Sequence, residues 1–305
     1  MKKIAITFCC IAGFLFEGCK EVPPTIIFHA SRAQDSTYVI SPAPAADPHN
    51  VLIEEFTGES CSNCPAAHTQ LDNNASVMAG RAIIISMYQN AQGLSIPPSG
   101  AYYDLRNDKV STIFGSVIYT TNQDATYGSL PGAGIDRTPL TPGTSTYLNA
   151  TTWAGLITTR TAVTDSLNLA VTSLYSAGVA TITATITYTQ AVSTPQNLSI
   201  AIVEDSIVDF QEEPFGVIDT AYVFNDVFVD MVTPAPFGDA ILDTLATKVA
   251  GRVLRKVYTY TLPTSFKKGS VNPAHCRVIA FVHQPQSASP DFHVIQSQQT
   301  KLMGP

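Results

Sequence analysis

Residues 51–65 constrain the fold of this chain more than any other stretch. They read Val-Leu-Ile-Glu-Glu-Phe-Thr-Gly-Glu-Ser-Cys-Ser-Asn-Cys-Pro. The apolar start predicts a buried strand over residues 51–56. Pro65 suits the first turn of a helix, where a missing backbone N–H leaves no bond unmade. Cys61 and Cys64 therefore stand at the start of a predicted helix that follows a buried strand.

Two cysteines in this position suit redox chemistry. The free N–H groups of a helix start and the helix dipole stabilise a thiolate on the first cysteine, and the second lies within reach of it. We expect Cys61 to be an exposed nucleophile and Cys64 its buried resolving partner. Alternatively, the pair is a permanent structural disulfide. Exchange is favoured because a bond between residues so close in sequence closes too small a loop to stabilise much.

The pattern around the cysteines indicates an α/β domain over residues 48–164. Apolar residues recur at helical spacing over residues 64–78, and a continuous apolar run over residues 81–88 predicts a second buried strand. Further helices are expected over residues 102–113 and 144–164.

From residue 165 to residue 305 the character changes. Short runs alternate apolar and polar residues and are separated by turn residues, which is typical of an antiparallel β-sandwich. The expected fold class is an α/β domain followed by an all-β antiparallel sandwich domain, with the boundary near residue 164.

The N-terminus has the parts of an export signal. Lys2 and Lys3 precede an apolar run over residues 4–16 that is too short to span a bilayer comfortably. The Gly-Cys that follows resembles a bacterial lipoprotein signal, which implies a signal peptide over residues 1–18, cleavage before Cys19 and lipid on the thiol of Cys19. An ordinary secretory signal cut nearby is the alternative, and it also predicts export. Residues 19–47, rich in Pro, Ala and Ser, suit a tether.

The sequence gives little indication that the protein binds nucleic acid, a cofactor or a metal. The net charge is −7 and no basic patch occurs, which argues against nucleic acid. No phosphate loop, dinucleotide fingerprint or nucleophile elbow is present, so no cofactor is expected. His275 and Cys276 are adjacent and would point to opposite sides of a strand, so no metal site is expected, and Cys276 should pack as a small apolar residue.

Two further features are expected to be structural. His68, one turn past Cys64, could tune the thiols, but a position on another face of the helix is favoured. An acidic run is interpreted as a solvated loop rather than a calcium loop, because it lacks regular ligand spacing. It comprises Glu204, Asp205, Asp209, Glu212 and Glu213.

A strand that leads into Cys-x-x-Cys resembles the thioredoxin superfamily. The resemblance implies a thioredoxin-like domain over residues 48–164 and a buried carboxylate, Glu55, that takes and returns the proton of Cys64. Alternation sends either Glu54 or Glu55 inward, and Glu55 is favoured. A cis-proline is also implied opposite the cysteines, with Pro131 as the best candidate and Pro139 and Pro142 as rivals. Ser60 stands where that superfamily usually has an aromatic residue.

A second resemblance covers almost all of the chain after the signal. Residues 51–68 look like the outer membrane protein twenty-eight-related lipoproteins of Bacteroidota, and residues 130–137, Leu-Pro-Gly-Ala-Gly-Ile-Asp-Arg, look like their proline–strand segment. Residues 201–207 and 278–282 resemble strands of their C-terminal domain. The chain departs from that family at residues 222–226, where a His-rich segment is common. The resemblance implies a lipoprotein with a thioredoxin-like domain and a β domain.

Together these features predict a lipoprotein of the cell envelope. It would be lipid-anchored to the outer membrane, on the periplasmic or the cell-surface face. Cys61, Cys64, Glu55 and Pro131 would perform thiol–disulfide exchange on exported or redox partner proteins, without a cofactor. The alternative is a non-catalytic binding or structural lipoprotein in which the Cys61–Cys64 disulfide is structural.

Overall fold

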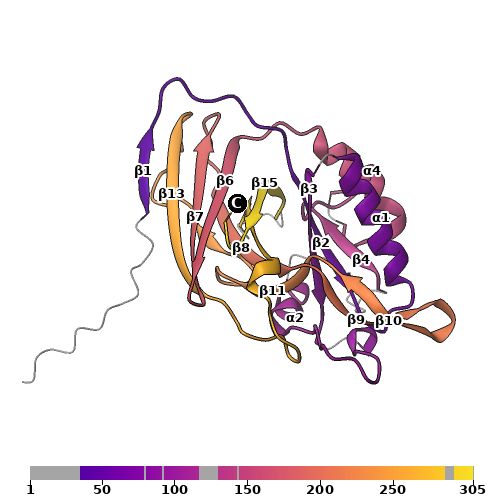
Figure 1. Ribbon diagram of the computed structural model, residues 1–305. Helices are drawn as coiled ribbons and strands as arrows, with labels where there is room; N and C mark the ends of the chain where they lie inside the picture. The colour runs from indigo at the N-terminus through magenta and orange to yellow at the C-terminus, as the bar shows by residue number, and fades with distance from the viewer. Residues whose placement is uncertain are drawn as a thin grey trace, which may run out of the picture. The chain divides into compact units, whose positions relative to one another are not determined.

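The computed structural model describes residues 35–78, 80–90, 93–116, 130–142, 144–285 and 292–304 (Figure 1). The expected signal peptide and Cys19 lie outside the described residues. The described residues belong to one compact unit. The fold is mostly β-sheet, with largely antiparallel pairing. No helix in the described ranges is long and apolar enough to cross a membrane.

Strands and helices alternate in the first half of the chain, and mainly strands follow in the second half. The helices are α1 (Cys64–Val77), α2 (Asp108–Phe114) and α4 (Ala150–Thr161). The strands of the first half are β1 (Ser36–Val39), β2 (Val51–Thr57), β3 (Ala82–Tyr88), β4 (Gly132–Ile135) and β5 (Leu148–Asn149). The remaining strands are β6 (Leu167–Ser176), β7 (Val179–Tyr188), β8 (Asn197–Glu204), β9 (Ile207–Glu213), β10 (Val217–Phe224), β11 (Val227–Met231), β12 (Asp239–Ala240), β13 (Arg252–Thr261), β14 (Cys276–His283) and β15 (Val294–Lys301).

The parallel pair β2 and β3 lies inside a nine-stranded sheet of order β15-β14-β8-β11-β3-β2-β4-β5, with β12 added beside β8. Every residue of β2 and β3 is buried, as their continuous apolar runs predict. On one face Val51 and Ile53 pack with Leu71 of α1 and Trp153 of α4. The opposite face of β2 and β3 packs against α2 and the cysteines.

The second sheet has the order β1-β13-β7-β6. Its inward residues alternate along β7, where Ala180, Ile182, Ala184 and Ile186 are buried. They share one core with Ile200 of β8 and the corresponding residues of β14. The two sheets therefore pack face to face at the β8–β14 end of the larger one.

The expected boundary near residue 164 does not divide the large sheet. Strands β8, β11, β14 and β15 all follow that residue, yet β11 pairs with β3 and the others continue outward from it. Alternation along a strand predicts which face is buried but not which neighbour the strand will pair with. The segments on either side of residue 164 thus share one sheet.

Three predicted element boundaries are corrected. Residues 35–47 are not a free tether: β1 pairs with β13, and Asp47 N donates to Asn168 Oδ1. The helix expected over residues 102–113 begins only at Asp108, because Asn107 caps it by accepting from Lys109 N. The helix expected over residues 144–164 is shorter, spanning Ala150–Thr161 after the short strand β5.

A buried ionic network fixes the chain as it enters β2. His49 Nδ1 lies 2.9 Å from Asp165 Oδ1, and its Nε2 lies 2.8 Å from Asp136 Oδ2. Arg160 Nε donates to the same Asp136 oxygen at 2.8 Å. Burial disfavours the imidazolium, but hydrogen bonds to Asp136 and Asp165 outweigh it and raise the pKa of His49 to about 9. The network ties β2 to the ends of β4 and α4.

Candidate functional site at the Cys61–Cys64 disulfide

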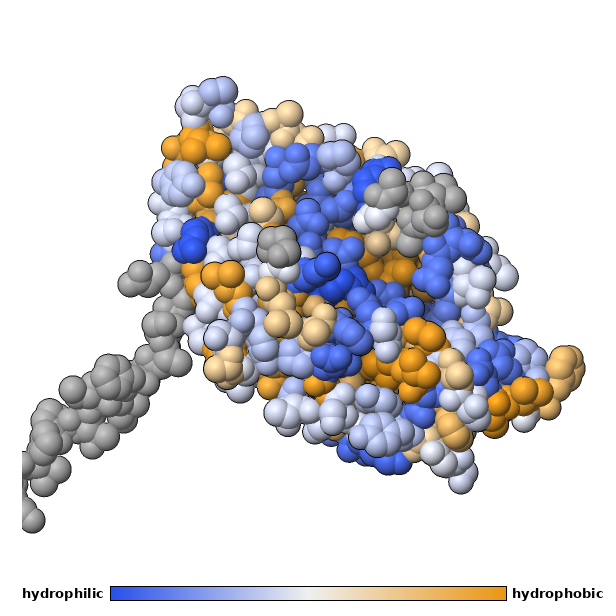
Figure 2. Space-filling view, viewed as in Figure 1, coloured by the Kyte–Doolittle hydropathy of each residue, from blue (hydrophilic) through white to orange (hydrophobic). Residues whose placement is uncertain are grey.

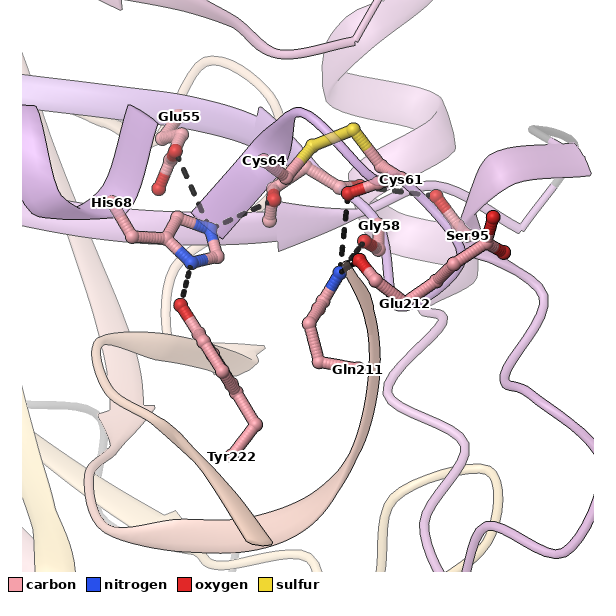
Figure 3. The surroundings of a disulfide bond; sticks show 10 residues. Glu55, Gly58, Cys61, Cys64, His68, Ser95, Gln211, Glu212 and Tyr222 are labelled. Atoms are coloured by element: carbon pink, nitrogen blue, oxygen red, sulfur yellow. Dashed lines mark hydrogen bonds and ion pairs between the residues drawn. A yellow bond between two sulfur atoms is a disulfide. The ribbon is translucent and has the colours of Figure 1, made fainter. Parts of the chain in front are cut away.

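Cys61 and Cys64 form a disulfide at the N-terminus of α1 (Figure 3). Residues 58–63 make the turn between β2 and the helix, and Cys64 N donates to Cys61 O at 3.0 Å. The predicted order of strand, turn, cysteine pair and helix is therefore present.

Neither cysteine is exposed, which corrects the expectation that Cys61 is an accessible nucleophile. The exposed fraction of Cys61 is 2%, and Cys64 is fully buried. Both pack in one core with Phe56 of β2 and with Leu130. A helix start is usually open to solvent, so other parts of the chain must cover this one.

The first covering segment follows β3. Ser60 N donates to Leu94 O at 2.9 Å, and Ser60 Oγ donates to Ile96 O at 2.7 Å. Gly58 permits this approach, because a Cβ at that position would lie 2.3 Å from the carbonyl oxygen of Leu94. Ser60, the position that lacks the expected aromatic residue, is thus bonded to this segment.

The second covering segment is the β9–β10 hairpin. Gln211 Nε2 donates to Cys61 O at 3.1 Å and to Gly58 O at 3.3 Å (Figure 3). Glu212 N donates to Glu59 O at 2.8 Å. The hairpin therefore holds the backbone carbonyl groups of Cys61 and of two residues before it, Gly58 and Glu59.

The acidic run in this region is not a solvated loop. Glu204 and Asp209 are buried, and Asp209 accepts from Tyr102 N at 3.0 Å and from Tyr103 N at 2.5 Å. Ile207, Asp209 and Gln211 alternate toward the protein along β9. Because two of these three residues are polar, the sequence shows no inward apolar alternation that would have identified a strand here.

Glu55 is buried at the end of β2, as expected. Ser86 Oγ donates to its Oε2 at 3.1 Å, and its Oε1 lies 3.5 Å from His68 Nε2. Burial raises the pKa of Glu55 to about 8, and the bond from Ser86 only partly opposes this shift. Its carboxyl group is therefore mostly protonated at neutral pH.

Glu54 is also buried, so the choice between the two glutamates was not exclusive. It lies on the opposite face of β2, where Arg137 Nε and Nη2 each donate to it at 2.7 Å. The guanidinium of Arg137 also stacks over Phe281 at 4.9 Å from the ring centroid. Sequence alternation predicts opposite faces, but not that a buried arginine would pair with one of them.

His68 belongs to the site, contrary to the favoured expectation. Its Nε2 lies 2.9 Å from Thr57 Oγ1, and its Nδ1 lies 2.6 Å from the Tyr222 hydroxyl of β10 (Figure 3). Burial lowers the pKa of His68 to about 4, so the ring is neutral at neutral pH. A Tyr222 O–H that donates to Nδ1 leaves the ring proton on Nε2, which then donates to Thr57 Oγ1, and Glu55 Oε1 lies further away at 3.5 Å.

A small polar cavity of about 30 Å³ adjoins these groups. Glu55, His68, Ser86, Tyr222 and Asp226 contribute to its lining. This volume has room for one water molecule with several polar partners.

Sequence reasoning missed Glu59, which lies two residues before Cys61. It is completely buried, and Leu105 N donates to its Oε2 at 3.3 Å. Burial raises the pKa of Glu59 to about 8. A polar residue in a turn gives no sequence signal of burial, because the covering segments come from distant parts of the chain.

The Leu130–Pro131 peptide bond is cis, at the position favoured from the sequence. Among the described residues neither Pro139 nor Pro142 follows a cis bond. Pro131 immediately precedes β4, whose Gly132 pairs with Phe56 of β2. The proline therefore lies at the same end of the sheet as the cysteine turn.

His275 and Cys276 do not form a ligand pair. Cys276 is buried and donates to Asn272 O at 3.4 Å, and burial raises the pKa of its thiol to about 12. His275 is exposed. Cys276 packs as the small apolar residue that the sequence predicted.

Comparison with known proteins points to one family and one fold. The family described as Outer membrane protein Omp28 matches residues 121–304, more than half of the chain, and this range begins after the cysteine pair. No curated protein matches. The solved structure of HBP35 of Porphyromonas gingivalis superposes with a TM-score of 0.64 at 16% identity, covering 85% of this chain and 77% of that one. A protein of Agrobacterium tumefaciens superposes with a TM-score of 0.47 at 13% identity, covering 84% and 95%.

Proposed function

Because the chain belongs to the Outer membrane protein Omp28 family, we propose that it is an envelope lipoprotein whose Cys61–Cys64 pair exchanges disulfides with exported proteins. Membership of the family indicates an outer membrane location. The export signal predicted from the sequence, with a cysteine at residue 19, supports lipid attachment there.

The proposed fold is a thioredoxin-like unit joined to a β-sandwich. Support for the first part comes from the parallel β2 and β3 with α1 between them, and from the antiparallel β4 that follows the Leu130–Pro131 bond. Support for the second part comes from the core shared by the four-stranded sheet, β8 and β14.

One arrangement carries the proposal of exchange: a disulfide at a helix N-terminus with a buried carboxyl group nearby whose pKa is raised. The helix N-terminus stabilises a cysteine thiolate. Glu55 holds a proton at neutral pH, and His68, one helical turn past Cys64, lies beside it. These are the groups that a leaving thiolate requires.

The chemistry balances without a cofactor. A substrate thiolate attacks Cys61 Sγ, a mixed disulfide forms, and Cys64 leaves as a thiolate that takes a proton supplied by Glu55. The second substrate thiol gives its proton to the Glu55 carboxylate and attacks the substrate sulfur of the mixed disulfide, which releases Cys61 as a thiolate. The substrate gains a disulfide and the cysteine pair gains two electrons; the reverse sequence reduces a substrate disulfide.

The second candidate is a structural disulfide in a binding lipoprotein. The burial of both cysteines favours it. The two candidates differ in reduction potential, because structural disulfides typically lie below about −300 mV and exchange enzymes lie above that value.

The test is a redox titration of the purified protein against glutathione or dithiothreitol buffers. We expect a potential above about −300 mV, in the range of exchange proteins. Glu55→Gln should slow exchange with a model disulfide by about a hundredfold, at the lower end of what a proton-transfer group contributes, and Cys276→Ala should leave it unchanged. A potential well below −300 mV, with no turnover, would exclude the enzyme.

Lipid attachment has its own test. We expect the wild-type protein to partition into detergent and to carry a lipid mass on the peptide that begins at Cys19. Cys19→Ala should abolish both properties, and Cys276→Ala should preserve them. An aqueous wild-type protein without the added mass would contradict the anchor.

A further inference from the structure

The β9–β10 hairpin stands apart from both large sheets. It connects β8 to β11, and within the described residues its two strands pair only with each other. Its base is anchored, because Ile207 and Phe224 pack with Tyr88, Leu105 and Val227. Figure 1 shows the rest of the hairpin extending beyond the helices.

The inward side of the hairpin bonds to the turn that carries the disulfide and to the helix after it. Gln211 and Glu212 bond to the backbone of residues 58–61, and Tyr222 bonds to His68. A side-chain amide and one backbone N–H hold the turn that contains Cys61. These few hydrogen bonds, each worth little net free energy, are compatible with opening while the base stays folded.

The outward side is apolar. Phe215 at the tip is fully exposed, and Val208, Ile218 and Val223 on the outward face are each more than a third exposed. Val217, next to the tip, is exposed on the other face. Figure 2 shows hydrophobic residues on the surface of this hairpin. The first covering segment, after β3, also exposes two apolar side chains, Leu94 and Ile96. Both segments that cover the disulfide therefore present apolar side chains to solvent, as protein-binding surfaces do.

The negative charge of the residues around this apolar surface indicates what kind of partner would bind there. Residues 204–226 contain no Lys or Arg, and Glu212, Glu213 and Asp219 flank the tip. An anionic lipid surface would be repelled. The outer edge of β10 lacks a strand partner in the described part of the chain, so an extended peptide can pair with it.

We propose that the β9–β10 hairpin is a lid on the Cys61–Cys64 disulfide, and that an extended apolar and basic segment of the substrate docks on its outer face and lifts it. The inference rests on the proposed function, since it names the substrate class and the gating of the same site. Docking breaks the bonds from Gln211 and Glu212 and exposes Cys61 Sγ to the substrate sulfur.

The lid is tested by the rate at which dithiothreitol reduces the disulfide, followed by alkylation and mass. Gln211→Ala removes both side-chain bonds to the turn and should accelerate reduction about tenfold. Gln196→Ala is the matched control, because Gln196 is also a buried glutamine but accepts a hydrogen bond from Tyr188 and does not bond to the cysteine turn. It should leave the rate unchanged. Equal rates for wild type and Gln211→Ala would overturn the lid.

Docking is tested with a synthetic peptide that carries a disulfide between apolar and basic residues. Phe215→Ser should slow exchange of the reduced protein with this peptide about fivefold or more, since it removes a large exposed apolar contact. The rate at which dithiothreitol reduces the disulfide of the oxidised Phe215→Ser protein should equal that of wild type. Leu174→Ser, at another strongly exposed apolar side chain on β6, is the control and should react like wild type. A peptide with Glu in place of the basic residues should react more slowly.

The outcomes separate the two proposals. Docking is refuted if wild type exchanges with the peptide no faster than with oxidised glutathione, or if Phe215→Ser does not change the rate with the peptide. Either result leaves the proposed function intact. Wild type that exchanges with neither disulfide refutes the proposed function and docking together, while the dithiothreitol rates still decide the lid.

Discussion

At the scale of single residues, buried charge is concentrated around β2. Glu54 and Glu55 lie on opposite faces of this strand and are both buried, but their surroundings differ. Glu54 meets a guanidinium, whereas Glu55 meets a hydroxyl and a neutral imidazole. One carboxylate is therefore held as part of an ion pair, and the other retains its proton near neutral pH.

Glu54→Gln should destabilise the protein by about 3–5 kcal/mol, because it leaves the charge of Arg137 buried without its counter-ion. Urea denaturation at pH 7 measures the change. Lys109→Ala is the control: it removes the ion pair with Asp230, in which the lysine side chain is 48% exposed, and should have an effect under about 1 kcal/mol. Equal effects of the two substitutions would contradict this account.

Because of His49, the free energy of unfolding should fall as the pH rises into the alkaline range. Folding raises its pKa from 6.5 to about 9, so its stabilisation is complete below pH 6.5 and is lost as pH rises through 9. The charged groups that face it are Asp136, Asp165 and, through Asp136, Arg160.

Urea denaturation at pH 6, 7.5 and 9 checks this dependence. His49→Asn should lower the free energy of unfolding at pH 6 by roughly 3 kcal/mol. The difference from wild type should shrink toward pH 9. His275→Asn, at an exposed histidine, should track wild type throughout. If the difference in free energy of unfolding between wild type and His49→Asn is the same from pH 6 to pH 9, the imidazole stabilises the fold without its charge.

At the scale of elements, the turn before α1 is determined by its neighbours. Gly58→Ala should destabilise the protein by roughly 1–3 kcal/mol, because the new Cβ would meet the Leu94 carbonyl oxygen at 2.3 Å. The disulfide should also become easier to reduce. Gly155→Ala is the matched control: it lies exposed in α4 with open space around it, and should stabilise by about 0.5–1 kcal/mol. Thermal denaturation compares the two, and opposite signs are expected.

The elements around the cysteines were more predictable than their accessibility. Periodicity located β2, α1 and β3 within a residue or two, because each buries a continuous or helical apolar pattern. It could not reveal that Gln211, about 150 residues further on, bonds to the Cys61 carbonyl. Contacts of this kind depend on pairing between distant strands, which leaves no local pattern.

At the scale of the whole molecule, the continuous sheet couples the two halves of the sequence. Strand β11 pairs with β3 on one side and β8 on the other, so unfolding either half removes partners from the other. A composition change near residue 164 suggested two domains because turn-rich alternating strands look the same whether they form a separate sheet or extend an existing one.

We expect one cooperative unfolding transition. Trp153, the only tryptophan, reports on the core under α4, and the thiol of Cys276 reports on the core between the sheets. Tryptophan fluorescence and alkylation of the Cys276 peptide, followed in the same urea series, should give the same midpoint. Two separated midpoints would show that the halves fold independently.

The insertion point of the hairpin has a consequence for how such proteins can diversify. Glu204 and Val227 pair directly across β8 and β11, so the chain leaves and re-enters the sheet at neighbouring positions. The intervening residues can lengthen, shorten or change sequence while the sheet keeps its register. Evolution or design can therefore exchange this excursion as a module and change the surface beside the cysteine turn, with the sheet around that turn left as it is.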